Sequence, residues 1–123
     1  MIIKILEEMS NLKLKKDYRN YRNLSKILYD TINMDILRDP KIYKMNSDEF
    51  YKIGFGKLFF DVMTILIKEI NNNNEALNIS LSSKDYIDFK LISQTNITLK
   101  YLLERLTEIK NRIIPNGFDS DLM

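Results

Sequence analysis

The residues best suited to chemistry are a set of cations between positions 15 and 26. They are Lys15, Arg19, Arg22 and Lys26, with Tyr18 and Tyr21 between them. Their spacings of four, three and four residues place the cations along one face of a helix. Such a face could neutralise phosphates through its cations and stack bases on its rings. The alternative is a solvated helix face, which the net charge of only +2 favours.

Catalytic chemistry has little support in the composition. The chain contains no histidine and no cysteine, so it lacks the commonest general base, the thiolate nucleophile and the usual ligands of zinc. The carboxylates show no spacing typical of a metal site. Lys57 and Asp61, four residues apart, are expected to form an ion pair on a solvent-facing stripe. We therefore predict a protein that is not an enzyme, with no catalytic residues, no cofactor and no metal.

Length and composition indicate one small globular domain. The chain has 123 residues, of which 45% are hydrophobic and 29% charged, as in ordinary globular proteins. We predict a single helical domain over residues 1–114 and a flexible acidic tail over 115–123. No signal peptide is apparent, and the longest apolar run is too short to span a bilayer. A cytoplasmic protein without membrane contact is the expectation.

The stretch 47–70 is predicted to be the central helix of the fold. Asn46 can cap it together with Glu49 three residues later. Apolar residues then recur at helical spacing over most of the circumference, which predicts burial by other helices. Gly54 and Gly56 cost helix stability, and close approach of a neighbouring helix is the expected reason, with a kink or a ligand against the bare backbone as the alternative. The run Asn71–Asn74 is predicted to end the helix in a surface loop.

Three further segments are predicted to pack around this helix. Ile2–Leu12 has its apolar residues at helical spacing, and a break is expected between Lys13 and Asp17. Asp17 can cap a second helix that runs to Asn33. The Asp39-Pro40 pair predicts a loop or a short helical turn. Helical periodicity returns over Ile97–Ile114, before Pro115.

The stretch 76–92 can be interpreted in two ways. Apolar and polar residues alternate on both sides of the Ser82–Asp85 segment, which favours a β-hairpin. In the alternative, Ser82 caps one long helix that joins Phe89 and Ile92 to Leu99, Leu103 and Leu106, and the fold is all-α. The predicted fold class is therefore mainly α, a small helical bundle with a hairpin as the favoured form of this stretch.

One short segment resembles a known family. Tyr21-Arg22-Asn23-Leu24, together with the length and helical content, is similar to small helical subunits of type III CRISPR effector complexes. That resemblance implies a subunit that lines a nucleic-acid filament.

The sequence thus predicts one of two binding functions. The first is a small non-enzymatic protein that binds another protein, as accessory and inhibitor proteins of phages and mobile elements do. The second is a nucleic-acid-binding helical subunit of a ribonucleoprotein complex, which would use the basic face. The sequence does not determine the partner or the oligomeric state.

Overall fold

The structure, a computed structural model, describes residues 1–52 and 55–115, and these residues form helices and no strand. In chain order the helices are α1 (Ile2–Leu14), α2 (Tyr18–Ile32), the π-helix η1 (Asn33–Leu37), the 3₁₀ helix η2 (Pro40–Tyr43), α3 (Ser47–Lys52), α4 (Phe55–Ser82) and α5 (Tyr86–Ile113). The predicted helical bundle is confirmed. The predicted tail from residue 116 onward lies outside the described residues.

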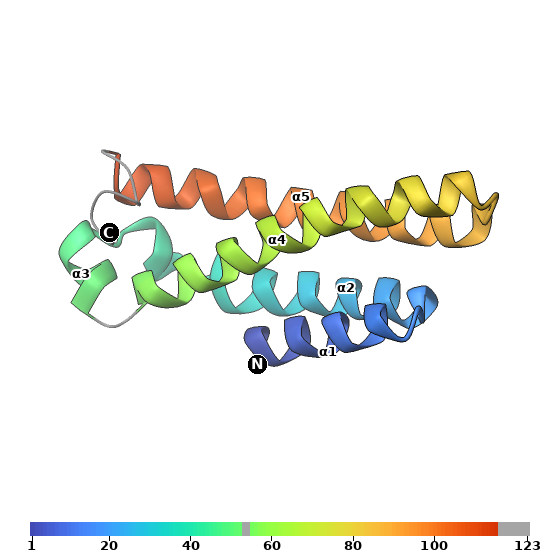
Figure 1. The fold of residues 1–123 in the computed structure, drawn as a ribbon. Helices are drawn as coiled ribbons and strands as arrows, with labels where there is room; N and C mark the ends of the chain where they lie inside the picture. The colour runs from blue at the N-terminus through green and yellow to red at the C-terminus, as the bar shows by residue number, and fades with distance from the viewer. Residues whose placement is uncertain (53–54, 116–123) are drawn as a thin grey trace.

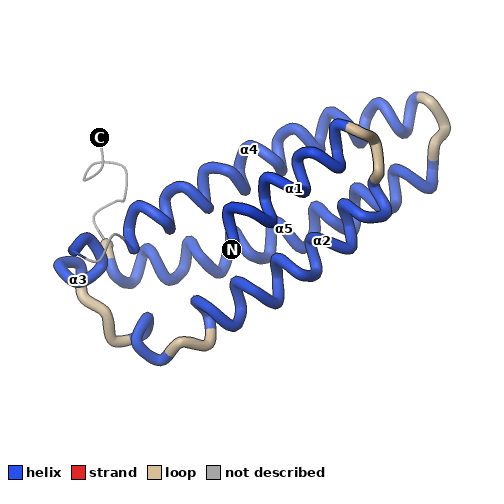
Figure 2. Tube along the Cα trace, turned by 90° about the horizontal axis from the view of Figure 1, so that it is seen from below, coloured by secondary structure: helices blue, strands red, loops and turns tan. Residues whose placement is uncertain are grey.

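The long helices α1, α2, α4 and α5 lie side by side (Figure 1). α1 and α2 run antiparallel to each other, and so do α4 and α5 (Figures 1 and 2). The two pairs meet mainly through α2 and α5, and more lightly through α1 and α4. α4 starts at the end of the bundle where α2 stops, and α5 returns to that same end (Figure 1). α2 and α5 therefore run parallel to each other. The segment that contains η1, η2 and α3 crosses the end of the bundle and connects α2 to α4.

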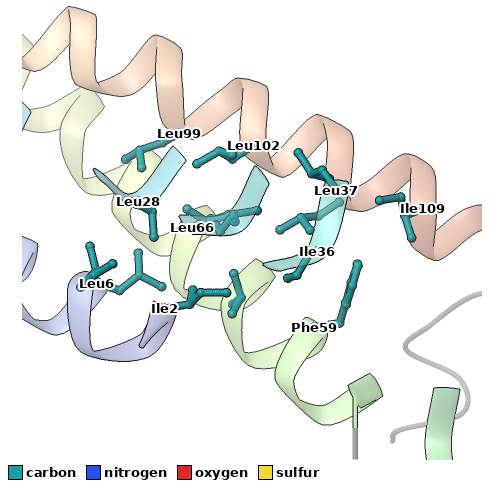
Figure 3. Packing of buried hydrophobic residues seen from close by; sticks show 14 of the residues in the cluster. Ile2, Leu6, Leu28, Ile36, Leu37, Phe59, Leu66, Leu99, Leu102 and Ile109 are labelled. Carbon is teal, nitrogen blue, oxygen red and sulfur yellow. The ribbon is translucent and has the colours of Figure 1, made fainter. Parts of the chain in front are cut away.

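The core lies between these helices, and each contributes one stripe of side chains (Figure 3). Leu6, Leu28, Leu66 and Leu99 are buried and come from α1, α2, α4 and α5 respectively. The outer face of α4 is open, since Ile67 is 46% exposed. The helix is therefore buried along one stripe, not over most of its circumference as the sequence suggested.

The predicted cap at Asn46 is confirmed, but the single central helix predicted over 47–70 is divided between α3 and α4. The Glu49 amide donates to Asn46 Oδ1 at 2.9 Å, and the Asn46 amide donates to Glu49 Oε1 at 3.5 Å, which is a capping box. Gly54 lies outside the described residues. At Gly56, an added Cβ would lie 2.8 Å from Cε1 of Phe50, so close packing of α3 explains this glycine. The sequence analysis expected a different helix to approach here, whereas the contact comes from Phe50, inside the stretch that was predicted as one helix.

The predicted hairpin at 76–92 is wrong, and so is the predicted helix end at Asn71–Asn74. α4 continues to Ser82, and α5 begins at Tyr86 after the cap residue Asp85. Tertiary packing overrides the local preferences, because Asn73 is fully buried and hydrogen-bonded. Apolar residues that alternate with polar ones do not all fall on one face of a helix. Exposed apolar residues are left on both helices at Ile79, Leu81, Tyr86 and Ile87.

The first part of the chain follows the prediction closely. α1 ends at Leu14, and the Asp17 side chain caps α2 by accepting from the Asn20 amide. Asp39 caps η2, with Pro40 at its first position. This crossover is held to the end of α5 because the Arg112 guanidinium donates to the carbonyls of Ile42 and Tyr43.

Candidate functional site

The predicted basic face is divided between two elements. Lys15 is the C-cap of α1 and precedes α2, whereas Arg19 and Lys26 are exposed on α2 itself. Arg22 is half-buried, and its Nη1 donates to Oε1 of Gln94 on α5 at 2.8 Å. The structure therefore leaves Lys15, Arg19 and Lys26 facing solvent, while Arg22 connects two helices.

The two tyrosines of the predicted face have different surroundings. Tyr18 is half-buried and meets the Tyr21 ring edge-on, with 6.4 Å between centroids. Tyr21 is fully buried, so its ring does not offer a surface for stacking. Lys13, which the sequence placed in a break, lies with its Nζ 5.9 Å from the centroid of that ring.

Tyr21 instead belongs to a buried polar cluster that joins α1, α2, α4 and α5. The polar cluster consists of Ser10, Lys13, Tyr21, Glu69, Asn73 and Asn96. The Tyr21 hydroxyl donates to Glu69 Oε2 at 2.7 Å, and Lys13 Nζ lies 3.1 Å from the same oxygen. Asn73 Nδ2 donates to Asn96 Oδ1 at 3.2 Å. The sequence analysis did not anticipate this cluster, because its members are spread over four helices.

Burial and charge set the protonation state of Tyr21 within the cluster. Burial and the nearby Glu69 carboxylate raise the pKa of Tyr21 above its ordinary value of 10.0, since both disfavour a phenolate. The Glu69 carboxylate also pairs with Lys13 Nζ at 3.1 Å, and the raised pKa keeps Tyr21 a neutral phenol that donates to this carboxylate. The polar groups of the cluster bind one another, which suits a structural role better than a substrate site.

A surface groove lies between the parallel helices α2 and α5. It has a volume of ≈ 620 Å³ and is lined by Lys26, Tyr29, Asp30, Ile97, Thr98 and Tyr101. We call these residues the aromatic groove. The Tyr29 and Tyr101 rings pack against each other with 5.8 Å between centroids. Ile97 is 68% exposed, and Tyr101 is 44% exposed. The groove therefore presents apolar and aromatic surface to solvent.

The face of α5 beside the groove is apolar only in part, since Lys90 and Gln94 separate Ile87 from Ile97. Ile87, Lys90, Gln94, Ile97 and Tyr101 follow one another at spacings of three or four residues, which places them on one face. This face spans about 21 Å at 1.5 Å per residue. The sequence analysis missed it because Ile87 was assigned to a strand and Ile97 to a helix start. The available signal was the apolar pair Ile97 and Tyr101 at helical spacing, which lies outside the buried stripe of α5.

Charged residues border the aromatic groove in an uneven way. Arg19, Lys26, Lys90 and Lys100 are exposed, and none of them has a salt bridge within the described ranges. Because α2 and α5 run parallel, Arg19 and Lys90 lie toward the same end of the groove. The acidic residues Asp30 and Glu104 lie toward the other end. The lining itself carries one cation, Lys26, and one carboxylate, Asp30, and the end near Arg19 and Lys90 also carries the cap residues Asp17 and Asp85. The charge around the groove is therefore mixed.

Other candidate sites have less support. In residues 1–52 and 55–115, no group of three or more Asp or Glu side chains is placed to hold a metal ion. Lys57 and Asp61 form the expected ion pair at 3.1 Å, with side chains 80% and 42% exposed. No helix within the described ranges is long and apolar enough to cross a membrane.

Comparisons of the chain with protein-family models, curated proteins and solved structures find no match. Any functional assignment therefore has to be argued from the geometry of the surface.

Proposed function

We propose that this protein is a small non-enzymatic interaction module that binds a partner protein in the aromatic groove. The observation that carries the proposal is the pairing of Tyr29 and Tyr101 beside the exposed Ile97. Tyrosines supply large contact areas and are enriched where binding energy concentrates. Exposed apolar surface rimmed by charged residues is typical of protein-binding sites. An accessory or inhibitor protein would act by this kind of contact alone.

The side chains of the groove suit binding better than catalysis. Its polar residues are Lys26, Asp30, Thr98 and the two tyrosine hydroxyls. No hydrogen bond among the described residues joins a hydroxyl to a base within the groove, as an activated nucleophile requires. Since helices hold every lining residue, the surface is preorganised for a partner.

Nucleic-acid binding is the second candidate. Lys15, Arg19 and Lys26 favour it, because phosphate contacts need accessible cations and these three are exposed, with no salt bridge among the described residues. It ranks second because Tyr21 is buried, and because the exposed Asp30 and Asp35 follow Lys26 along the chain toward η2. Lys41 and Lys44, on or beside η2, are thus separated from the α2 cations by carboxylates.

Site-specific photo-crosslinking in the organism that encodes the protein tests the proposal. A benzophenone amino acid at position 97 should crosslink to one protein, which mass spectrometry identifies. The same probe in place of Ile67, which is 46% exposed on the outer face of α4, is the matched control. The purified partner should then bind the wild type and lose affinity for Tyr101→Ser. Crosslinks to nucleic acid at position 97 would favour the alternative, and equal crosslinking from both positions would contradict a specific groove.

A further inference from the structure

We propose that the aromatic groove binds helix α2 of a second copy of this chain, so that the protein forms a symmetric homodimer. This inference rests on the proposed function, since it names the protein that occupies the groove. It follows from the two charges in the lining, from the shape of the surface beside the groove and from the low net charge of the chain.

The two charged side chains of the groove make its surface complementary to itself. Lys26 and Asp30 lie four residues apart on α2, and both line the groove. Neither has a salt bridge among the described residues, although the same spacing on α4 gives the Lys57–Asp61 pair. A surface that satisfies both needs a carboxylate level with Lys26 and a cation level with Asp30. An antiparallel copy of α2 presents its charges in that order.

A two-fold axis forms both ion pairs in one contact. Lys26 lies two positions before Leu28, and Asp30 lies two positions after it. Leu28 itself is buried, so it marks only the level of the axis along the helix. When two α2 helices lie antiparallel about this level, Lys26 of each copy is level with Asp30 of the other. Such an isologous contact is the commonest kind in homodimers.

The shape of the surface fits the same contact. A second hollow of ≈ 370 Å³ lies beside the later turns of α2 and is lined by Met1, Ile27, Asp30, Thr31, Met34 and Asp35. Because Asp30 lines both hollows, α2 stands between them as a ridge. Ile27 is 51% exposed on this ridge, and in the antiparallel contact it is level with Tyr29 of the other copy. The groove is lined by about one turn of each helix, which suits one such ridge.

The exposed apolar surface on this side of the molecule also favours association. Five large side chains that line the two hollows are at least 44% exposed, namely Met1, Ile27, Met34, Ile97 and Tyr101. A patch of this kind with charged residues beside it is typical of association sites. The net charge of +2 opposes the approach of two copies only weakly.

Sedimentation equilibrium of the full chain with paired charge reversals tests the inference. The variants are Lys26→Asp and Asp30→Lys, and circular dichroism first confirms that each one folds. Lys57→Asp and Asp61→Lys are the matched controls, because they reverse the same residue types at the same spacing on α4. A second measurement uses the benzophenone amino acid at position 97 in the otherwise unchanged chain.

We expect the wild type to dimerise and each groove variant to weaken the dimer by at least about tenfold at low salt, because like charges then face each other. An equimolar mixture of Lys26→Asp and Asp30→Lys should dimerise as the wild type does, since every carboxylate faces a lysine in the mixed dimer. The two controls should leave the dissociation constant unchanged. Irradiation of the probe at position 97 should join two copies, with the attachment on α2.

Three results would contradict the homodimer. A chain that stays monomeric at every concentration, while position 97 crosslinks to a different protein, would overturn it and leave the proposed function standing. A dimer that the charge reversals leave unchanged, or that the mixture fails to restore, would show that two copies meet at another face. A monomeric chain with equal crosslinking from positions 97 and 67 would overturn both the homodimer and the proposed function.

Discussion

At the scale of single residues, the most informative group is the polar cluster. Glu69 is a buried carboxylate, and such a charge is stable only when it is paired and hydrogen-bonded. Lys13 supplies the pair, and Tyr21 and Ser10 supply further donors. Because these donors come from α1 and α2, the cluster fixes how the first pair of helices sits on α4.

The first prediction concerns the ion pair. Lys13→Met should lower the free energy of unfolding by about 2 to 3 kcal/mol, since Glu69 would lose its counter-charge. The loss stays moderate because the Lys13 side chain is 18% exposed and Tyr21 still donates. Urea unfolding measures the difference. The control Lys57→Met, at a side chain 80% exposed, should change stability by less than about 0.5 kcal/mol. Equal losses in the two variants would contradict a structural role for the cluster.

The second prediction concerns pH. The pKa of Tyr21 is raised above 10.0 in the folded protein, so the unfolded chain releases this proton first as the pH rises. Stability should therefore be unaffected below about pH 9 and should fall above about pH 10, by up to about 1.4 kcal/mol per pH unit from this group. Tyr18 shifts in the same direction and adds to the slope. In Tyr21→Phe the alkaline slope should be shallower, and an unchanged slope would rule out this origin.

At the scale of elements, α3 and α4 meet through one tight contact. The Phe50 ring lies against Gly56, where an added Cβ would approach Cε1 and Cδ1 at 2.8 and 2.9 Å. The ring also packs edge-on against Phe59, with 5.4 Å between centroids. The glycine therefore permits an aromatic contact that holds the short helix α3 on the end of the bundle.

The third prediction tests this contact. Gly56→Ala would gain about 1 kcal/mol from helix propensity in an open position. Here it should destabilise the protein by about 1 to 2 kcal/mol, because the new methyl group overlaps the Phe50 ring. Thermal unfolding measures the change. In the background of Phe50→Leu the same substitution should cost much less, and an undiminished cost would show that the ring is not the cause.

At the scale of the whole molecule, one side of α4 faces the core of the bundle and the opposite side faces solvent. Leu66 is fully buried, whereas the adjacent Ile67 is 46% exposed. The core therefore depends on which side of α4 faces the other helices. The aromatic groove lies on the α2–α5 side of the bundle, so changes there should affect binding more than folding.

The fourth prediction compares these neighbours. Leu66→Ala should lower the free energy of unfolding by about 2 to 5 kcal/mol, because it leaves a cavity in the core. Ile67→Ala removes a side chain of the same size from the outer face and should cost less than about 1 kcal/mol. Chemical denaturation of both variants gives the comparison. Similar costs would mean that α4 is enclosed on both sides, as in a larger assembly.

The sequence alone determined the local features of this protein. The Asp17 and Asn46 caps, the short η2 helix at Asp39-Pro40 and the Lys57–Asp61 pair all depend on residues within four positions of one another. Such interactions form wherever the helix forms, so spacing in the sequence is enough to predict them.

The tertiary structure decided the rest. Asn73 favours a turn in isolation, yet α4 continues through it because Tyr21 and Asn96, 52 and 23 positions away, satisfy its amide. The polar cluster and the aromatic groove likewise unite residues from separate helices. Periodicity shows which residues share a face but not which helix that face will meet, so these sites exist only once the bundle has formed.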